Sequence, residues 1–239
     1  MFALNLKGKR TGKSLIQKPL EAFGLVEIAI VLIIIGILAS LGMKGYKLIE
    51  SAKVKALHQQ IDDVRLATHM FKEKYHAFPG DFAGAQSAIH SNCLNGNGNG
   101  LIEGRNADSQ SEAGQFWTHL TLAELVTGIE PSQSGQQLVP SKHLLSGKIE
   151  GFLTIQHSFK GDTGPWVCLS HVDSSGSLKP CLTPKQAADI DQAFDDGNPL
   201  SGDICASGEN ENTGACIKGN HYNLESKNQA CMAYFKLSK

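Results

Sequence analysis

The sequence predicts an α+β protein in which one long N-terminal helix precedes a domain built on an antiparallel β-sheet. Three patterns indicate this fold: an almost uninterrupted apolar run over residues 23–43, a helical pattern that continues over residues 44–78, and short turn-separated segments over residues 79–239. The chain has 239 residues and a formal net charge of −1. The part after the first helix is long enough for one hydrophobic core, so we expect a single domain there.

The apolar run is long enough to cross a bilayer, which takes about 20 helical residues, and it is too long for the core of an ordinary secretory signal. Residues 1–22 form a basic leader with a single acid, Glu21. The basic residues of the leader are Lys7, Lys9, Arg10, Lys13 and Lys18. Because positive flanks stay in the cytoplasm, we expect the bulk of the chain on the other side of the membrane.

Glu27 lies inside the apolar run, where a charged carboxylate costs about 2.5–3.5 kcal/mol. An acidic residue at membrane depth is a functional-site hypothesis by default, and it needs a cationic partner. The simpler alternative is an uncleaved single-pass anchor on some other periplasmic protein. An ordinary anchor has no use for a carboxylate at this depth, so the functional interpretation is preferred.

The junction of leader and apolar run resembles the prepilin signal of type IV pilins and type II secretion pseudopilins. The resemblance rests on the basic leader, on Ala22, on Phe23-Gly24-Leu25-Val26-Glu27 and on the ending Ile35-Gly36-Ile37-Leu38-Ala39-Ser40. The family usually has glycine where this chain has Ala22. The resemblance implies that a prepilin peptidase cuts between Ala22 and Phe23 and that the Phe23 amine is methylated. It also implies that Glu27 pairs with the Phe23 amine of a neighbouring subunit.

The resemblance covers about residues 18–80 closely and implies a pilin-like fold, with the first helix packed on an antiparallel sheet. The implied partners are other pilin or pseudopilin subunits, the prepilin peptidase, inner-membrane lipid and the inner-membrane assembly platform. The implied location is the bacterial inner membrane, with a single span and a periplasmic head, followed by a pilus or pseudopilus.

The function implied by the resemblance is that of a structural subunit, minor or specialised, of a type IV pilus or related filament. Two alternatives stay open: a pseudopilin that drives protein export in a type II secretion system, and an adhesin or binding module carried on a filament. Residues 74–82 and 182–202 resemble segments of a subgroup of pilin-like proteins, in which Cys231 and Tyr234 belong to the last strand.

Neither catalysis nor nucleic-acid binding is indicated. The sequence has no His-Glu-x-x-His, no Gly-x-Ser-x-Gly and no glycine loop with the lysine that phosphate binding needs. His119, close to Trp117, is interpreted as a structural histidine rather than a general base. The near-neutral charge and the absence of a basic cluster after Lys74 argue against strong binding to nucleic acid. We therefore expect neither an enzyme nor a nucleic-acid partner.

The helical pattern over residues 44–78 is amphipathic. Its apolar positions recur at spacings of four and three: Leu57, Ile61, Val64, Thr68, Phe71 and Tyr75. We expect the helix to run to about Tyr75, to end before Pro79-Gly80, and to bury this stripe against the sheet.

The head, residues 79–239, is predicted to contain two further helices and at least three strands. One helix opens at Ser111-Glu112, and the other at Thr183-Pro184, where Gln186 completes a capping box. Strands are predicted over residues 149–159, 166–172 and 231–237 from their alternating apolar side chains.

All six cysteines follow the membrane segment: Cys93, Cys168, Cys181, Cys205, Cys216 and Cys231. An even number on the side that faces an oxidising compartment indicates a disulfide framework, although sequence does not choose the connectivity. Cys168 with Cys181 is the best single pair, since the turn over residues 173–177 can fold two short strands onto each other. The absence of Cys-x-x-Cys disfavours zinc binding and thioredoxin-type chemistry.

One loop has the spacing of a metal site. Asn95, Asn97 and Asn99 alternate with glycines, and Asp81, Glu103 and Glu112 are the acids that can complete an oxygen shell for calcium. The loop has few carboxylates and carries Asn106 where a calcium loop has its bidentate acid, so a solvated turn-rich loop is the preferred interpretation. Asp195, Asp196 and Asp203 form a weaker acidic cluster that turn formation explains. No other cofactor is expected.

Overall fold

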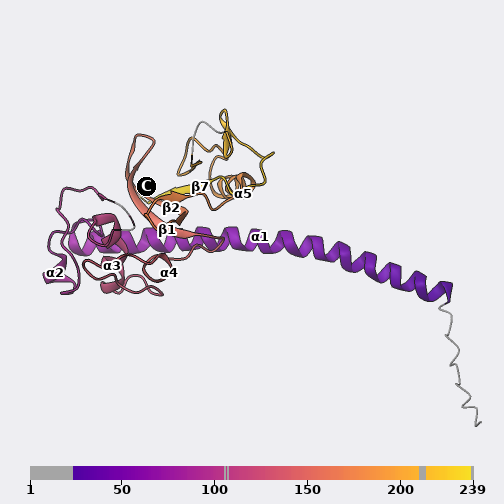
Figure 1. Cartoon of the computed structure of the whole chain (residues 1–239), viewed down its shortest axis with the longest axis horizontal. Coiled ribbons are helices and arrows are strands. Elements are labelled where there is room, and N and C mark those ends of the chain that lie inside the picture. Colours follow the sequence, from indigo (N-terminus) through magenta and orange to yellow (C-terminus); the bar gives the residue numbers. More distant parts are fainter. Residues whose placement is uncertain (1–23, 105, 107, 210–213, 238–239) are drawn as a thin grey trace, which may run out of the picture. The chain divides into compact units, whose positions relative to one another are not determined.

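A computed structural model describes residues 24–104, 106, 108–209 and 214–237. The chain divides into two compact units, residues 1–48 and residues 49–239, and each is described by itself. Helix α1, Leu25–Tyr75, contributes to both units (Figure 1). The chain combines this helix with an antiparallel sheet, which confirms the predicted α+β class.

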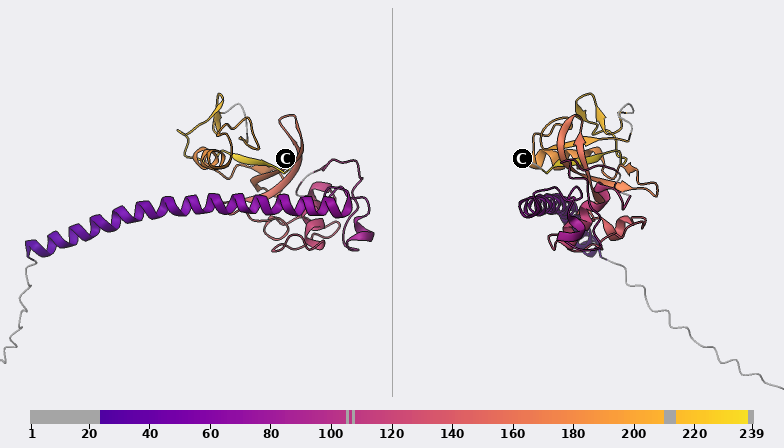
Figure 2. Two further views of the ribbon diagram at one scale, coloured as in Figure 1. Left: turned by 180° about the vertical axis from the view of Figure 1, so that it is seen from behind. Right: turned by 90° about the vertical axis from the view of Figure 1, so that its left-hand side faces the viewer.

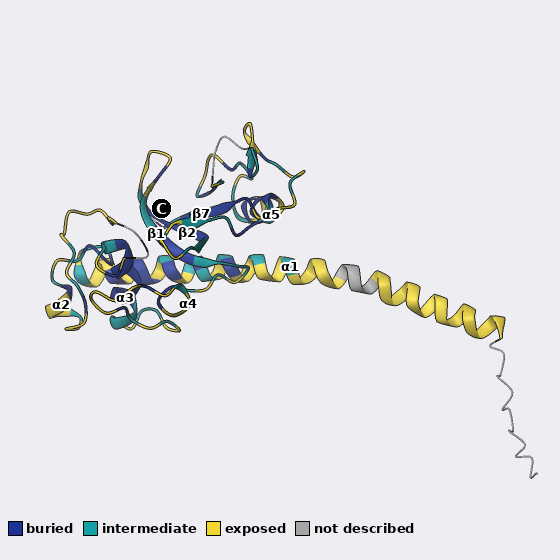
Figure 3. Ribbon diagram, in the orientation of Figure 1, coloured by how far each residue is buried: buried dark blue, intermediate teal, exposed yellow. Residues whose placement is uncertain are grey.

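In the first unit, α1 is apolar and exposed on all sides. Every residue from Gly24 to Ser40 is exposed to solvent (Figure 3). Among the described helices, α1 alone is long and apolar enough to cross a membrane, by length and composition. An apolar helix without a buried face needs lipid or other protein around it, because so much exposed apolar surface is unfavourable in water.

In the second unit, α1 is amphipathic as predicted. Leu57, Ile61, Val64 and Phe71 are almost completely buried, whereas Asp63 between them is exposed. The helix ends at Tyr75, and the next residue, His76, has a left-handed φ of 55°. The predicted end before Pro79-Gly80 is therefore confirmed.

The main sheet has five strands in the order β1-β2-β7-β4, with β3 paired to β2, and all its pairs are antiparallel. The strands are β1 (Phe152–Phe159), β2 (Asp162–Val172), β3 (Leu178–Lys179), β4 (Ile204–Ser207) and β7 (Met232–Lys236). A separate ribbon pairs β5 (Ile217–Lys218) with β6 (His221–Tyr222). The three predicted strands are confirmed as β1, β2 and β7.

The two faces of the sheet carry different clusters, because successive side chains on a strand point to opposite sides. Leu153, Val167 and Phe235 join the main core, which includes the buried stripe of α1. The opposite face carries a small cluster of Phe159, Trp166, Cys168, Cys205, Met232 and Tyr234. In both views of Figure 2, the segment between α1 and β1 gathers around the C-terminal end of α1, beside the sheet.

The predicted helices of the head are α3 (Glu112–Leu122) and α5 (Pro184–Phe194). The Ser111 side chain caps α3 by accepting a hydrogen bond from the Gly114 N–H, and Thr183 with Gln186 forms the predicted capping box of α5. Two single-turn helices, α2 (Ala85–Ala88) and α4 (Pro140–His143), complete the helical elements of the described residues.

Side chains and loops pair parts of the outward-facing backbone of β1 and β4. On β1, the Asn106 side-chain amide accepts from the Ile155 N–H and donates to the Ile155 carbonyl oxygen, each at 2.7 Å. On β4, the Ile204 N–H donates to the Asp195 carboxylate at 2.7 Å. Further along that edge, the Ala206 N–H donates to the Pro199 carbonyl and the Lys160 ammonium donates to the Ala206 carbonyl. Side chains and loops thus occupy positions that a further strand would need.

Candidate functional sites

The first candidate site is the carboxylate of Glu27 in the opening turn of α1. Its Oε2 accepts a hydrogen bond from the Gly24 N–H at 2.9 Å, and the residue is exposed. No lysine or arginine occurs between Phe23 and Met43, and no ion pair to Glu27 exists among the residues that the structure describes. The partner that the structure describes for this carboxylate is the Gly24 N–H. Ala22 and Phe23, the expected cleavage site, lie outside the described residues.

The second candidate is the asparagine–glycine loop, in which carboxylates organise the backbone. Asp81, which is 2% exposed, accepts from the Asn99 N–H at 3.0 Å and from the Gly100 N–H at 2.9 Å. Glu112 accepts from the Asn97 N–H at 2.8 Å and from the Glu103 N–H at 3.0 Å. The loop is therefore held by charge-assisted hydrogen bonds from N–H groups.

The side-chain oxygens of the three asparagines are likewise used within the protein. Asn95 Oδ1 accepts from the Gln86 N–H at 2.8 Å, and Asn97 Oδ1 and Asn99 Oδ1 each accept from a backbone N–H two residues ahead. The amide groups of Asn97 and Asn99 both donate to Glu103 Oε2 at 3.0 Å. The structure brings Asp81, Asn97, Asn99, Glu103 and Glu112 into one loop network, but it directs the Asn95 oxygen away to Gln86. The three asparagine oxygens thus accept hydrogen bonds within the protein, and calcium binding at this loop stays a prediction.

A more compact group of acids lies at the C-terminal end of α5, in the region of the weaker predicted cluster. Asp191, Asp195 and Asp196 bring one carboxylate oxygen each within 4.8 Å of one another. Asp191 is completely buried and accepts from the Tyr222 hydroxyl at 2.7 Å and the Gly197 N–H at 3.0 Å. Burial raises the pKa of Asp191, while the Ser201 hydroxyl and the Asn198 N–H lower the pKa of Asp196. These bonds tie α5 to β6 and to the following turn, which is a structural role.

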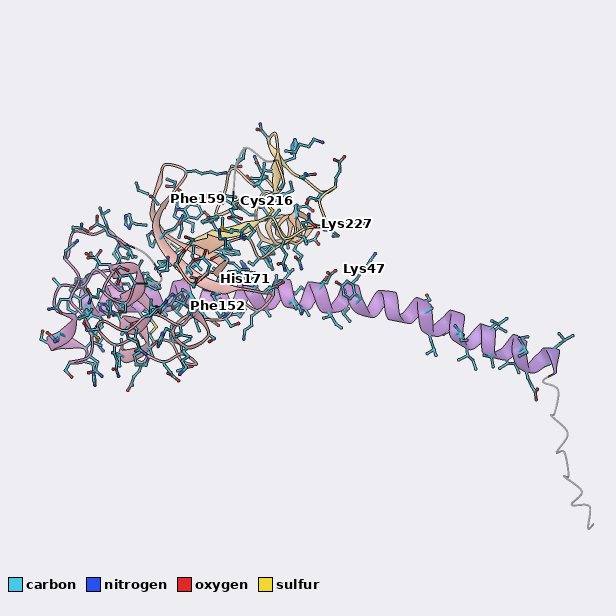
Figure 4. All side chains as sticks on the ribbon, viewed as in Figure 1. Lys47, Phe152, Phe159, His171, Cys216 and Lys227 are labelled. Carbon is cyan, nitrogen blue, oxygen red and sulfur yellow. A yellow bond between two sulfur atoms is a disulfide. The ribbon has the colours of Figure 1, made fainter. Side chains whose placement is uncertain are left out.

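The cysteines differ from the prediction. Cys216, labelled in Figure 4, forms a disulfide with Cys231. The other four cysteines are buried free thiols: Cys93, Cys168, Cys181 and Cys205. Burial raises the pKa of Cys93 and Cys205 to about 11 and that of Cys168 to about 12, and it also raises the pKa of Cys181. Thiols with such pKa values are unreactive at neutral pH.

The predicted Cys168–Cys181 pair is wrong, although the turn that suggested it is real. The β2–β3 hairpin pairs His171 with Lys179, and continuing this register places Cys181 opposite Leu169. The Cys181 thiol indeed lies 3.4 Å from the Leu169 carbonyl oxygen. Cys168, one residue away, therefore points to the opposite face of the sheet.

His119 has the structural role that the sequence indicates. It is completely buried, its Nδ1 accepts from the Gly80 N–H at 2.9 Å, and its Nε2 lies 2.8 Å from the Leu94 carbonyl oxygen. Acceptance at one nitrogen and donation at the other fix the neutral tautomer. Burial lowers the pKa of His119 from 6.5 to about 4. The ring connects α3 to the segment that follows α1.

We expect this histidine to make the head less stable as the pH falls from about 6.5 to 4. In this window the histidine is protonated in the unfolded chain and neutral in the folded protein. The free energy of unfolding therefore falls by up to about 1.4 kcal/mol per pH unit, or about 3 kcal/mol in all. Denaturant unfolding of wild type and His119→Gln at a series of pH values measures the difference. The difference should be constant above pH 7 and change with pH only inside the window, and a constant difference throughout would contradict the assignment.

Two structural contacts could not be read from the sequence: the pairing of Asn106 with Ile155 and the bond between Tyr222 and Asp191. Both join residues that are far apart in the chain, and no local motif marks them. No protein-family model, curated protein or solved structure matches the chain.

Proposed function

We propose that this chain is a structural subunit of a type IV pilus or a related filament, anchored in the inner membrane and assembled through α1. The observation that supports the proposal most strongly is the first part of α1. It is apolar and exposed on every side, and its only charge is Glu27 in the first turn. A helix of this kind is stable in lipid or among other helices, and its carboxylate needs a cation that the segment itself does not contain.

Assembly exchanges helix–lipid contacts for helix–helix contacts, which are driven by packing and by polar pairs rather than by the hydrophobic effect. The α-amine that cleavage before Phe23 would create is a cation near the depth of Glu27. A pair between Glu27 of one subunit and this amine of the next joins two different surfaces. Such a heterologous contact generates a filament when its rotation does not close into a ring.

Pili and secretion pseudopili share this chemistry, so the proposal covers both kinds of filament. Subunit in surface fractions sheared from cells would favour a pilus. Its absence there, together with a defect in release of exported proteins when the gene is deleted, would favour secretion. The third alternative, an adhesin, uses the same filament and gives the head an additional binding surface.

Processing tests the proposal directly. In membranes with an active prepilin peptidase, we expect intact-mass analysis and N-terminal sequencing to find a chain that starts at a methylated Phe23. Ala22→Phe places a bulky side chain before the cut, so this variant should keep its leader. A wild-type chain that still begins at Met1 beside an active peptidase would refute the proposal.

A further inference from the structure

The asparagine–glycine loop holds three consecutive Asn-Gly steps, at Asn95-Gly96, Asn97-Gly98 and Asn99-Gly100, and the proposed function uses none of them. Asn-Gly is the peptide step most prone to intramolecular rearrangement, because glycine has no Cβ to hinder its own nitrogen. The three asparagines are exposed, so water and hydroxide reach them.

The reaction needs no reagent except water. The glycine nitrogen loses its proton to hydroxide and attacks the side-chain carbonyl carbon of the preceding asparagine. A new C–N bond forms, the side-chain nitrogen leaves as ammonia, and a five-membered succinimide results. Water then opens the ring at either carbonyl and gives aspartate or isoaspartate. Attack requires a glycine N–H that is free to ionise and an asparagine side chain that is free to rotate.

Neither condition is met at any of the three steps in the folded protein. The Gly96 N–H donates to the Phe82 carbonyl at 3.0 Å, and the Gly98 N–H donates to the Asp81 carbonyl at 2.9 Å. The Gly100 N–H donates at 2.9 Å to Asp81 Oδ2, a side-chain carboxylate. Each asparagine side chain is held in turn by the backbone N–H that its Oδ1 accepts.

We propose that the loop over residues 95–100 is a latent succinimide-forming modification site that the fold holds closed, with the Asp81 carboxylate as the group that closes Asn99-Gly100. The two earlier steps are protected by backbone carbonyls, which no substitution removes. The last step depends on a side chain. In addition, a negative carboxylate in contact with the Gly100 N–H opposes ionisation of that nitrogen, because like charges repel.

Modification at Asn99 would also remove one of the hydrogen bonds that hold the loop. Its amide now donates to Glu103 Oε2 at 3.0 Å, and deamidation replaces this donor with a second carboxylate. Two carboxylates that face each other repel, and isoaspartate further lengthens the backbone by one methylene. Asn97 donates to the same Glu103 oxygen, so displacement of Glu103 also frees the Asn97 side chain. Modification at Asn99 should therefore speed the reaction at the neighbouring Asn97-Gly98 step.

The test compares ageing of the full chain in detergent with ageing of its own peptide. Trypsin cuts after Lys74 and Arg105, so one peptide carries all three steps. Folded protein is aged at mildly alkaline pH and then digested, the peptide is digested first and then aged, and mass spectrometry locates aspartate and isoaspartate. In the wild type, each step should react slower in the folded protein by about tenfold or more, which corresponds to a local opening free energy of about 1.4 kcal/mol.

Asp81→Ala should accelerate the reaction at Asn99 more than at Asn95 and Asn97 of the same molecule, so each molecule contains its own control. Asp63→Ala, at an exposed aspartate of α1, should leave all three rates unchanged. If Asp81→Ala does not fold, Asp81→Asn keeps the size of the side chain and removes only its charge, and the same order of sites is expected. Equal acceleration at the three sites of a folded variant would overturn the assignment of Asp81. Equal rates at Asn99 in folded wild type and in the peptide would overturn the whole proposal.

Discussion

Glu27→Gln should leave this chain inserted and cleaved in the membrane but remove it almost completely from filaments. The amide keeps the size of the side chain and loses the charge. A carboxylate costs about 2.5–3.5 kcal/mol at this depth, and the amide avoids part of this cost of insertion. In the proposed filament, incorporation would lose a charge pair in a low-dielectric environment and leave the partner amine buried without its carboxylate. Breaking a buried pair in this way typically costs about 3–5 kcal/mol, which exceeds a hundredfold in affinity.

The experiment measures cleaved monomer in the membrane against subunit in sheared or cross-linked fibres, with any major subunit present. Glu27→Asp retains the charge but withdraws it by one methylene, so its incorporation should be intermediate. Glu73→Gln makes the same chemical change at an exposed position near the C-terminal end of the same helix, and it should incorporate like wild type. Incorporation of Glu27→Gln at the wild-type level would show that this charge does not position the subunit.

Gly80→Ala should strongly destabilise the head. Gly80 has a φ of 89°, and a Cβ there would overlap the Glu112 carbonyl oxygen in the first turn of α3. The Gly80 N–H also donates to His119, so the backbone cannot move away without breaking this buried bond. Left-handed backbone costs roughly 1–2 kcal/mol for alanine, and the overlap adds to it. We expect a total of about 4 kcal/mol or more.

Gly128→Ala is the matched control. Gly128 has the same φ of 89°, and a Cβ there would meet no atom within 4 Å. Its substitution should cost only the roughly 1–2 kcal/mol of the left-handed backbone. Denaturant unfolding of both variants of the full chain in detergent isolates the overlap as the difference between them. Equal destabilisation by the two substitutions would mean that the packing of Gly80 on α3 contributes nothing.

The elements that local chemistry determines could be predicted from the sequence. The amphipathic stripe of α1, its end near Tyr75, and the caps at Ser111 and Thr183 each depend on residues within a few positions of one another, and the structure confirms them. Glu27 could likewise be singled out, because a charge in an apolar run is visible without any fold.

Features that depend on strand register could not be predicted. A shift of one residue moves a side chain to the other face of a sheet, and this is why the turn after β2 was predicted correctly while the Cys168–Cys181 pair was wrong. Strand β4 was not predicted because four residues are too short for a periodic signal, and only pairing with β7 reveals it. The spacing of Asn95, Asn97 and Asn99 left a calcium site open beside the preferred turn-rich loop, and only the structure shows which backbone N–H groups their oxygens accept.

The pairing of edge backbone in β1 and β4 affects how readily two heads can associate through their strands. Open strand edges act as templates for backbone pairing between chains, and proteins held at high local concentration are the most exposed to this hazard. Here Asn106 pairs with the backbone of Ile155 on β1, and Asp195 pairs with the Ile204 N–H on β4. In the proposed subunit, heads stored side by side in a membrane would find backbone pairing hindered at these two positions. Strand pairing between heads would then compete less with growth of the proposed fibre.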